Sequence, residues 1–398
     1  MNKRVAGHKI AGGVVKAPLQ ALCVVLIFCC VAVLILQSGV FSSITIQADD
    51  YVEYWAAGRL NVVGANPYDP AQLLSVQLTT GRTHGIPVMM WNPPYTLAIV
   101  MPLALLPYAM SRTLWYLMSI ACVGISALWL WRVCEGAVEQ TWVPLVVAFS
   151  FYPTIILLQT GQIGGLLLLG FAGFLYFEGR RDYLAGTFAA LLAVKPHLMY
   201  LFWLALVADA WSRRRWKAPL ATLAALSLAT VLAAAANPRV VQQYYSAAVG
   251  NPPVMWATPT LGGMLRSALG YERAYLQFVP ALVGLAWLGW TWRAGFAWDW
   301  RGRAACLALM SVVTAVYGWS YDKVLLLIAP ISVVALSPRS GQMWVRLVPA
   351  MYAGLMLLAF LVRRGDEFSD IWFGPVLLAW YLVAQRMLIA PRQVVDFR

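Results

Sequence analysis

Apolar residues run in long segments along most of this chain, and polar residues are largely confined to the stretches between them. The first apolar segment, residues 19–40, exceeds the roughly 20 residues that a helix needs to cross the hydrocarbon of a bilayer. Judged by length, the pattern to residue 389 predicts about 11 to 13 membrane helices. We therefore expect an all-α polytopic membrane protein that forms a single integral membrane domain over residues 1–398.

Composition and charge support this expectation and exclude other classes. The chain is 61% hydrophobic and only 11% charged, whereas soluble proteins carry roughly 25% charged residues. The net charge of +13 is typical of a nucleic-acid-binding protein, but the basic residues stand mainly between apolar segments. With the N-terminus on the cytoplasmic side, most of them fall in inner loops, as the positive-inside rule requires. The basicity therefore indicates topology, and we expect membrane lipids rather than nucleic acid as partners.

Two segments predicted to lie outside the membrane are far longer than a helix connection needs. They cover residues 41–92 and 237–275, and both are rich in aromatic, amide, Pro and Gly residues. Long ordered loops of this kind are usually functional. A shorter apolar stretch, residues 95–106, is bounded by prolines and is expected to form a broken or re-entrant helix rather than a full span.

An acidic and aromatic stripe opens the first outer segment. In helical phase Asp50, Glu53 and Tyr54 share one face, close to the water boundary of the outer leaflet. One of its carboxylates is a candidate general base, and Asp49 competes with Asp50 for that assignment. The alternative is that Asp49 or Asp50 only caps the helix that follows, a position at which acidic residues are favoured.

Polar residues that interrupt apolar segments are a second source of candidates, because such groups are costly in a membrane. In Lys195-Pro196-His197 the proline breaks the helix, and the two basic side chains suit a phosphate. The alternative is a lysine that snorkels to the interface and a histidine bonded to a backbone carbonyl.

Weaker candidates are polar residues for which a structural role is equally available: an outer turn, an interfacial ion pair or a lipid contact. They are Gln162, Asn92, Asp322, Lys323 and Arg266.

Several short motifs in a fixed order resemble glycosyltransferase family 87. The resemblance covers about residues 20 to 340, and its weight comes from the order and spacing of the motifs. These are Asp50-Tyr51-Val52-Glu53-Tyr54, Gly64-Ala65-Asn66-Pro67-Tyr68-Asp69, Trp91-Asn92-Pro93-Pro94, Gly161-Gln162, Lys195-Pro196-His197 and Tyr321-Asp322.

The resemblance implies a GT-C type helical bundle in a bacterial inner membrane, with its active site on the non-cytoplasmic face. It implies transfer of a sugar from a polyprenyl-phosphate-linked donor to a hydroxyl of a glycolipid or glycan acceptor, without a cofactor or metal. Mannose is the expected sugar. Asp50 matches the position of the catalytic base, and Lys195, His197 and Gln162 match positions near the donor phosphate or sugar.

The residues themselves are consistent with such chemistry. Transfer of a glycosyl group needs a base for the acceptor proton and a cation for the departing phosphate, which Asp50 and Lys195 can supply. A multi-pass secondary transporter or a flippase for lipid-linked sugars is the alternative, since such proteins also bury Lys, His and Asp residues. The lack of a recognisable internal repeat disfavours it.

Overall fold

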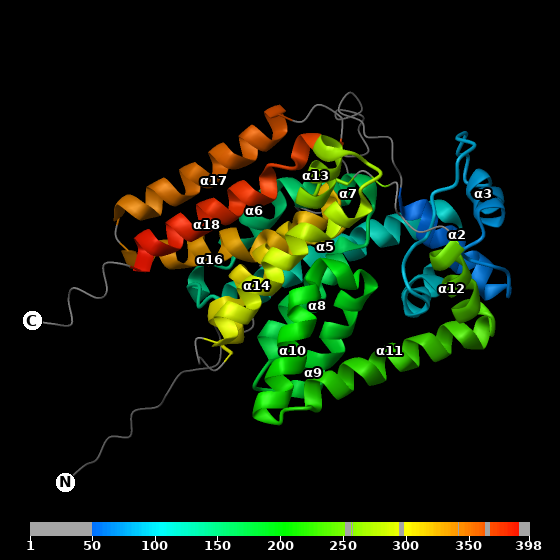
Figure 1. Cartoon of the computed structure of the whole chain (residues 1–398), viewed down its shortest axis with the longest axis horizontal. Helices are drawn as coiled ribbons and strands as arrows, with labels where there is room; N and C mark the ends of the chain where they lie inside the picture. Colours follow the sequence, from blue (N-terminus) through cyan, green and yellow to red (C-terminus); the bar gives the residue numbers. More distant parts are fainter. Residues whose placement is uncertain are drawn as a thin grey trace, which may run out of the picture.

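A computed structural model describes residues 50–250, 256, 258–293, 298–340, 342–362 and 367–389. The expected first span, residues 19–40, and Asp49 lie outside this part of the chain. Every regular element among the described residues is a helix, which confirms the all-α class. In Figure 1, α2, α3 and α12 lie at one end of the molecule and α17 and α18 at the other.

The first half of the described chain contains α2 (Tyr51–Val62), α3 (Pro70–Leu78), η2 (Pro94–Thr96), α4 (Leu97–Ala104), α5 (Tyr108–Val133), η3 (Val138–Gln140), α6 (Trp142–Ser150), α7 (Tyr152–Thr160), α8 (Gly164–Phe177), α9 (Asp182–Ala189), η4 (Ala190–Val194), η5 (Pro196–Met199) and α10 (Tyr200–Arg213). The second half contains α11 (Lys217–Ala236), α12 (Val240–Gly250), α13 (Leu261–Leu269), η7 (Ala274–Phe278), α14 (Val279–Arg293), α15 (Trp300–Val313), η8 (Ser320–Leu327), α16 (Ile328–Leu336), η9 (Ser337–Ser340), α17 (Gln342–Val362), η10 (Glu367–Asp370) and α18 (Phe373–Ile389).

Five helices of the described residues are long and apolar enough to cross a membrane, which confirms a multi-pass protein. They are Tyr108–Val133, Lys217–Ala236, Ala274–Arg293, Met343–Val362 and Phe368–Leu388. A sixth span results if α6 and α7 are taken together, although the chain bends by 66° between them. The sequence-based count of 11 to 13 includes apolar runs that the structure folds as shorter helices, such as Gly164–Phe177. The stretch expected to fall short of a full span, residues 95–106, is also a short apolar helix, Pro94–Ala104.

Two helical segments form a hairpin around Lys195. The helical segment formed by α9 and η4 ends at Val194, and η5 begins at Pro196 and leads into α10. Glu178, before α9, and Arg215, after α10, form an ion pair of 3.6 Å, so both open ends of the hairpin lie together. The break at Lys195 is therefore the tip.

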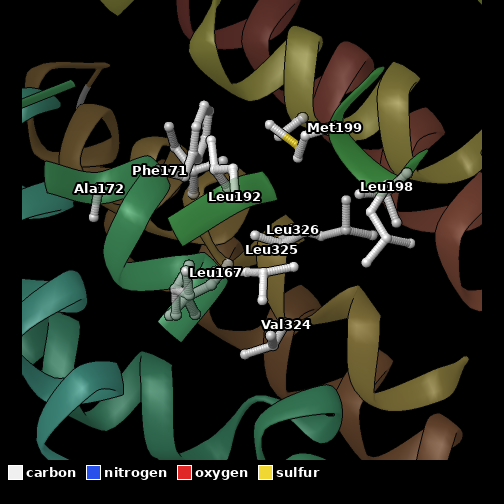
Figure 2. Packing of buried hydrophobic residues seen from close by; sticks show 14 of the residues in the cluster. Leu167, Phe171, Ala172, Leu192, Leu198, Met199, Val324, Leu325 and Leu326 are labelled. Carbon is white, nitrogen blue, oxygen red and sulfur yellow. The ribbon is translucent and has the colours of Figure 1, made fainter. Parts of the chain in front are cut away.

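A buried apolar core holds the elements around this tip in place. Figure 2 shows Leu167 and Phe171 of α8 beside Leu192 of η4 and Leu325 of η8, all of them inaccessible or nearly so. Gly170 and Gly173 allow α8 to approach the hairpin, because a Cβ atom at either would fall within 3.0 Å of Phe188. Consequently the ends of α8, η4 and η8 have fixed positions relative to one another.

Candidate active site

A cavity of about 790 Å³ opens among residues that are distant in sequence. Its walls come from the start of α2, the segment after α3, the turn between α7 and α8, the tip at Lys195, α12, and the residues that lead into η8. Both long outer segments predicted from the sequence contribute to it. A cavity of this volume is within the range of about 300 to 1,000 Å³ that is usual for small-molecule sites.

Asp50 lies at the N-terminus of α2, on the cavity wall. Its backbone N–H donates to the carbonyl of Thr160 at 2.9 Å. A glycine at position 161 permits this approach, since a Cβ there would be 3.1 Å from that of Tyr51 and the φ angle is +72°. The Asp50 carboxylate makes no capping hydrogen bond. Instead it accepts from the Gln162 side chain, so capping does not account for its orientation.

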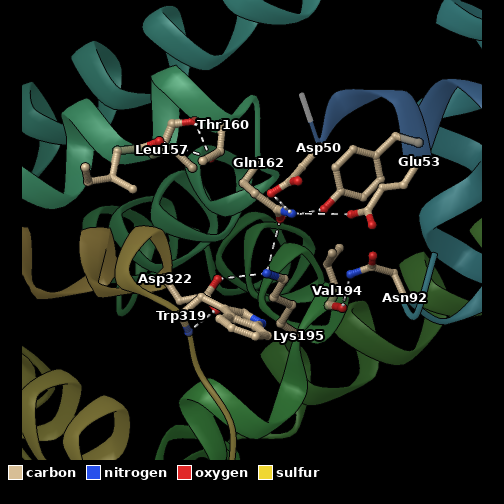
Figure 3. Close-up of polar contacts among 12 residues, drawn as sticks. Asp50, Glu53, Asn92, Leu157, Thr160, Gln162, Val194, Lys195, Trp319 and Asp322 are labelled. Atoms are coloured by element: carbon tan, nitrogen blue, oxygen red, sulfur yellow. Dashed lines mark hydrogen bonds and ion pairs between the residues drawn. The ribbon is translucent and has the colours of Figure 1, made fainter. Parts of the chain in front are cut away.

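Gln162 joins the acidic and basic parts of the site (Figure 3). Its Nε2 donates to Asp50 Oδ2 at 3.0 Å and to Glu53 Oε1 at 3.4 Å. Its Oε1 accepts from the Tyr54 hydroxyl at 2.7 Å and from Lys195 Nζ at 3.3 Å. These partners fix the amide orientation, because only Nε2 can donate to carboxylates.

Lys195 occupies the helix break with φ −134° and ψ 74°, outside helical values. Its Nζ forms an ion pair of 2.8 Å with Asp322 Oδ1 and lies 4.7 Å from the centroid of the Tyr321 ring. Asp322 Oδ2 accepts from the backbone N–H of Trp319 at 3.0 Å. The ammonium group therefore has a defined place at the cavity wall, and His197 lines the same wall with an exposed side chain.

Glu53 is a site residue to which sequence reasoning assigned no role of its own. It lines the cavity and is 7% exposed. Burial, reinforced by the nearby charge of Asp50, raises the pKa of Glu53 to about 8, although Tyr54, Lys195 and Gln162 act in the opposite direction. At neutral pH the site thus holds a neutral carboxyl group beside Asp50. The sequence signal for this position was the helical phase of the acidic stripe, which puts Glu53 on the same face as Asp50.

Asn92 supports the site from the first outer segment. It lines the cavity, and its Nδ2 donates to the carbonyl of Val194 at 3.0 Å. Tyr95 donates to the next carbonyl back, that of Ala193, at 2.6 Å. These bonds attach the segment to the end of η4, directly before Lys195.

Three candidates do not line the cavity, although one of them contacts the site. Tyr54 is fully buried behind Gln162. Arg266 is also buried, where it donates to the carbonyl of Tyr271 and to Gln277 Oε1. Lys323 Nζ donates to the backbone carbonyl of Asp370. The structure therefore places Arg266 in the packing of the second outer segment and Lys323 against η10, rather than with Lys195.

Asp370 was missed by the sequence analysis. It comes from η10, far along the chain from the other motifs, and still lines the cavity. Both of its carboxylate oxygens accept from the Tyr152 hydroxyl, at 2.9 and 2.8 Å. No local sequence pattern connects residue 370 to the site, so only the three-dimensional structure identifies it.

The arrangement provides a carboxylate and an ammonium group on one open cavity, at opposite ends of a single amide. Asp50 can accept a proton, and Lys195 can stabilise negative charge. Within the described residues, no group of three or more His, Cys, Asp or Glu side chains has the arrangement of a metal site.

Comparison with known protein families gives a match. The model of glycosyltransferase family 87 matches residues 91–330, which is more than half of the chain and includes the segments that carry Asn92, Gln162, Lys195 and Asp322. Neither the curated proteins nor the solved structures contain a significant match.

Proposed function

The chain belongs to glycosyltransferase family 87 and is a multi-pass membrane glycosyltransferase, and from this premise we propose the substrates and the residues that act on them. The donor is a sugar linked to a polyprenyl phosphate, and mannose is the sugar that we propose. The acceptor is a hydroxyl of a glycolipid or glycan. Transfer takes place on the non-cytoplasmic face of a bacterial inner membrane.

One observation carries this proposal: Asp50 and Lys195 meet the same Gln162 side chain at the wall of one cavity. A transferase that uses a sugar phosphate needs a base at the acceptor oxygen and a cation at the leaving phosphate. Because the two groups contact opposite ends of one amide, the acceptor would lie at Asp50 and the phosphate at Lys195, on the wall of the same cavity.

In the proposed reaction the acceptor oxygen attacks the anomeric carbon of the donor. The bond from that carbon to the phosphate oxygen breaks, and its electron pair leaves with polyprenyl phosphate. Asp50 takes the acceptor proton, while Lys195, with His197 near it, stabilises the phosphate charge. Because attack and departure occur on opposite faces of the ring, the anomeric configuration inverts.

The test is a turnover assay on purified protein in nanodiscs with a panel of polyprenyl-phosphate sugars and saccharide acceptors. Asp50→Asn should lower turnover by about 10² to 10⁴-fold, the usual contribution of a general base, with donor binding largely retained. The matched control is Asp69→Asn in the same outer segment. Asp69 caps α3 by accepting from the Gln72 backbone N–H, and Asn caps equally well, so this variant should keep full turnover.

Two results would contradict the proposal. Turnover that persists in Asp50→Asn would remove Asp50 as the base. Passage of a labelled lipid-linked sugar across sealed vesicles, without donor consumption, would instead support a flippase.

A further inference from the structure

Aromatic side chains from three separate segments meet at the cavity and form what we call the aromatic corner: Trp91, Trp256, Tyr317 and Trp319. Trp256 is the common member. Its ring centroid lies 5.1 Å from that of Trp91, 6.1 Å from that of Tyr317 and 6.4 Å from that of Trp319. The planes of Trp91 and Trp256 are inclined by 77°, so these two rings meet edge to face and neither stacks flat on the other.

These rings differ from the tryptophans that only pack the core. Trp115 and Trp131 are buried, and their indole N–H groups donate to the carbonyls of Gly161 and Ala137. The rings of the aromatic corner are all partly exposed, at the cavity. In the described part of the chain, the indole N–H groups of Trp91 and Trp256 have no protein acceptor.

The aromatic corner adjoins the polar residues around Lys195. Trp319 donates its backbone N–H to Asp322, and Asp322 pairs with Lys195. At the other end Trp91 precedes Asn92, which is bonded to the residue before Lys195. The rings are therefore part of the cavity wall next to Lys195.

The chemistry of the corner fits a sugar ring better than an isoprenoid chain. A pyranose has an apolar face of C–H groups and an edge of hydroxyls, and the negative face of an aromatic ring attracts such C–H groups. Isoprenoid needs only apolar surface, whereas this corner also offers two indole donors, the Asn92 side chain and the Ser320 residue beside Trp319. Partly exposed rings with a few polar groups are typical of a specific small-molecule site.

We propose that the aromatic corner is a binding subsite for a pyranose ring of a substrate, with Trp256 as its principal stacking surface. The proposal rests on the proposed function for its physiological ligand. Binding of a saccharide at the corner does not require turnover, however, and can be measured separately.

The experiment measures binding of methyl α-D-mannopyranoside and methyl β-D-glucopyranoside to the full chain in nanodiscs by saturation-transfer NMR. The wild type should bind at least one of them saturably, with the strongest transfer to ring C–H protons. Trp256→Leu and Trp91→Leu should each weaken binding by about tenfold, and Trp256→Phe by about threefold or less because it keeps a ring. The control is Trp211→Leu, at a tryptophan of α10 that is 76% exposed and away from the cavity; it should bind as the wild type does.

Four outcomes would overturn the subsite: no saturable saccharide binding, unchanged binding in both Trp256→Leu and Trp91→Leu, equal loss in Trp211→Leu, or weaker binding of farnesyl phosphate alone in Trp256→Leu. The last would identify the corner as an isoprenoid contact. Asp50→Asn should retain saccharide binding, so failure of the catalytic proposal and failure of the subsite give different results. In the turnover assay, the substrate whose KM rises in Trp256→Leu is the one whose ring occupies the corner.

Discussion

Two ion pairs, one at the hairpin tip before η5 and one in α10, have nearly the same length and very different surroundings. Lys195 Nζ and Asp322 Oδ1 are 2.8 Å apart, and Arg213 Nε and Asp209 Oδ1 are 2.9 Å apart. The first joins residues that are 127 positions apart in sequence and lies on the cavity. The second joins neighbouring turns of α10, where Arg213 also donates to the carbonyl of Trp298 and Asp209 accepts from Trp300.

The comparison shows that a charged pair inside a membrane protein is not by itself a sign of function. Arg213 and Asp209 have other protein partners that account for their place in the fold, and they do not line the cavity. Lys195 also contacts Gln162, which connects it to Asp50 and Glu53. The Lys195–Asp322 pair differs in two ways: it lines the open cavity, and Gln162 connects it to the ionisable groups of Asp50 and Glu53.

The largest expected difference between the two pairs is in turnover. Lys195→Met should lower kcat by about 10² to 10³-fold, as loss of a group that stabilises transition-state charge usually does. Arg213→Met should lower the thermal unfolding midpoint and leave kcat within about twofold, because it removes a structural ion pair. Steady-state kinetics and thermal unfolding of both variants test this. Equal effects of the two variants on kcat would mean that position on the cavity carries no functional information.

A smaller effect is expected for the link itself. Gln162→Leu removes the amide that orients Asp50 and Lys195 but keeps both charges, so kcat should fall by about 10 to 10²-fold through lost positioning. Gln140→Leu, at an exposed position of η3, is the matched control and should keep wild-type kcat. If Gln162→Leu is as active as this control, the two charged groups do not depend on a shared amide.

The smallest effect at neutral pH is expected for Glu53→Gln. With a pKa of about 8, Glu53 is neutral at pH 7, and Gln should change kcat by about twofold or less. Above pH 8 the wild type gains a second negative charge beside Asp50, and its kcat should fall with a dependence that the variant lacks. Glu139→Gln, at an exposed position, should keep the wild-type pH profile. If the wild type and both variants share one pH profile of kcat, Glu53 does not cause the fall in kcat above pH 8.

The same group affects stability in a direction that can be worked out. The pKa of Glu53 is raised from 4.5 to about 8 in the folded protein, so the unfolded chain releases this proton more readily than the folded chain does. The contribution of Glu53 is therefore most favourable below pH 4.5 and is lost as the pH rises toward 8. Glu53→Gln should show a flatter dependence of the unfolding midpoint on pH over this range.

Sequence reasoning identified the fold class because long apolar segments leave no other option for a chain of this composition. It left the exact number of membrane helices open, since an apolar helix enclosed by protein has the same pattern as one that faces lipid. The helix α8 is an example: it has 14 residues, most of them buried against neighbouring helices. Burial by protein and burial by lipid favour the same residue types, so composition cannot separate them.

The residues that line the candidate site could be predicted only in part, for a related reason. Gln162 and Lys195 interrupt apolar segments, where a polar group needs an explanation, and Asp50 stands in an acidic stripe directly after the first apolar segment. Lys323 follows an apolar run and Arg266 stands in the second outer segment, but nearby carbonyl groups satisfy both side chains within the protein. Asp370 lies outside every motif and reaches the cavity only through the packing of η10 near Tyr152. Local pattern therefore finds polar residues, and tertiary structure decides which of them face the cavity.

The most direct test of the central claim is an experimental structure of the Asp50→Asn protein with a bound polyprenyl-phosphate sugar. The account predicts the phosphate within hydrogen-bond distance of Lys195 Nζ, and the sugar between that phosphate and the side chain at position 50. A phosphate bound elsewhere, with Lys195 still paired only to Asp322 and Gln162, would contradict it.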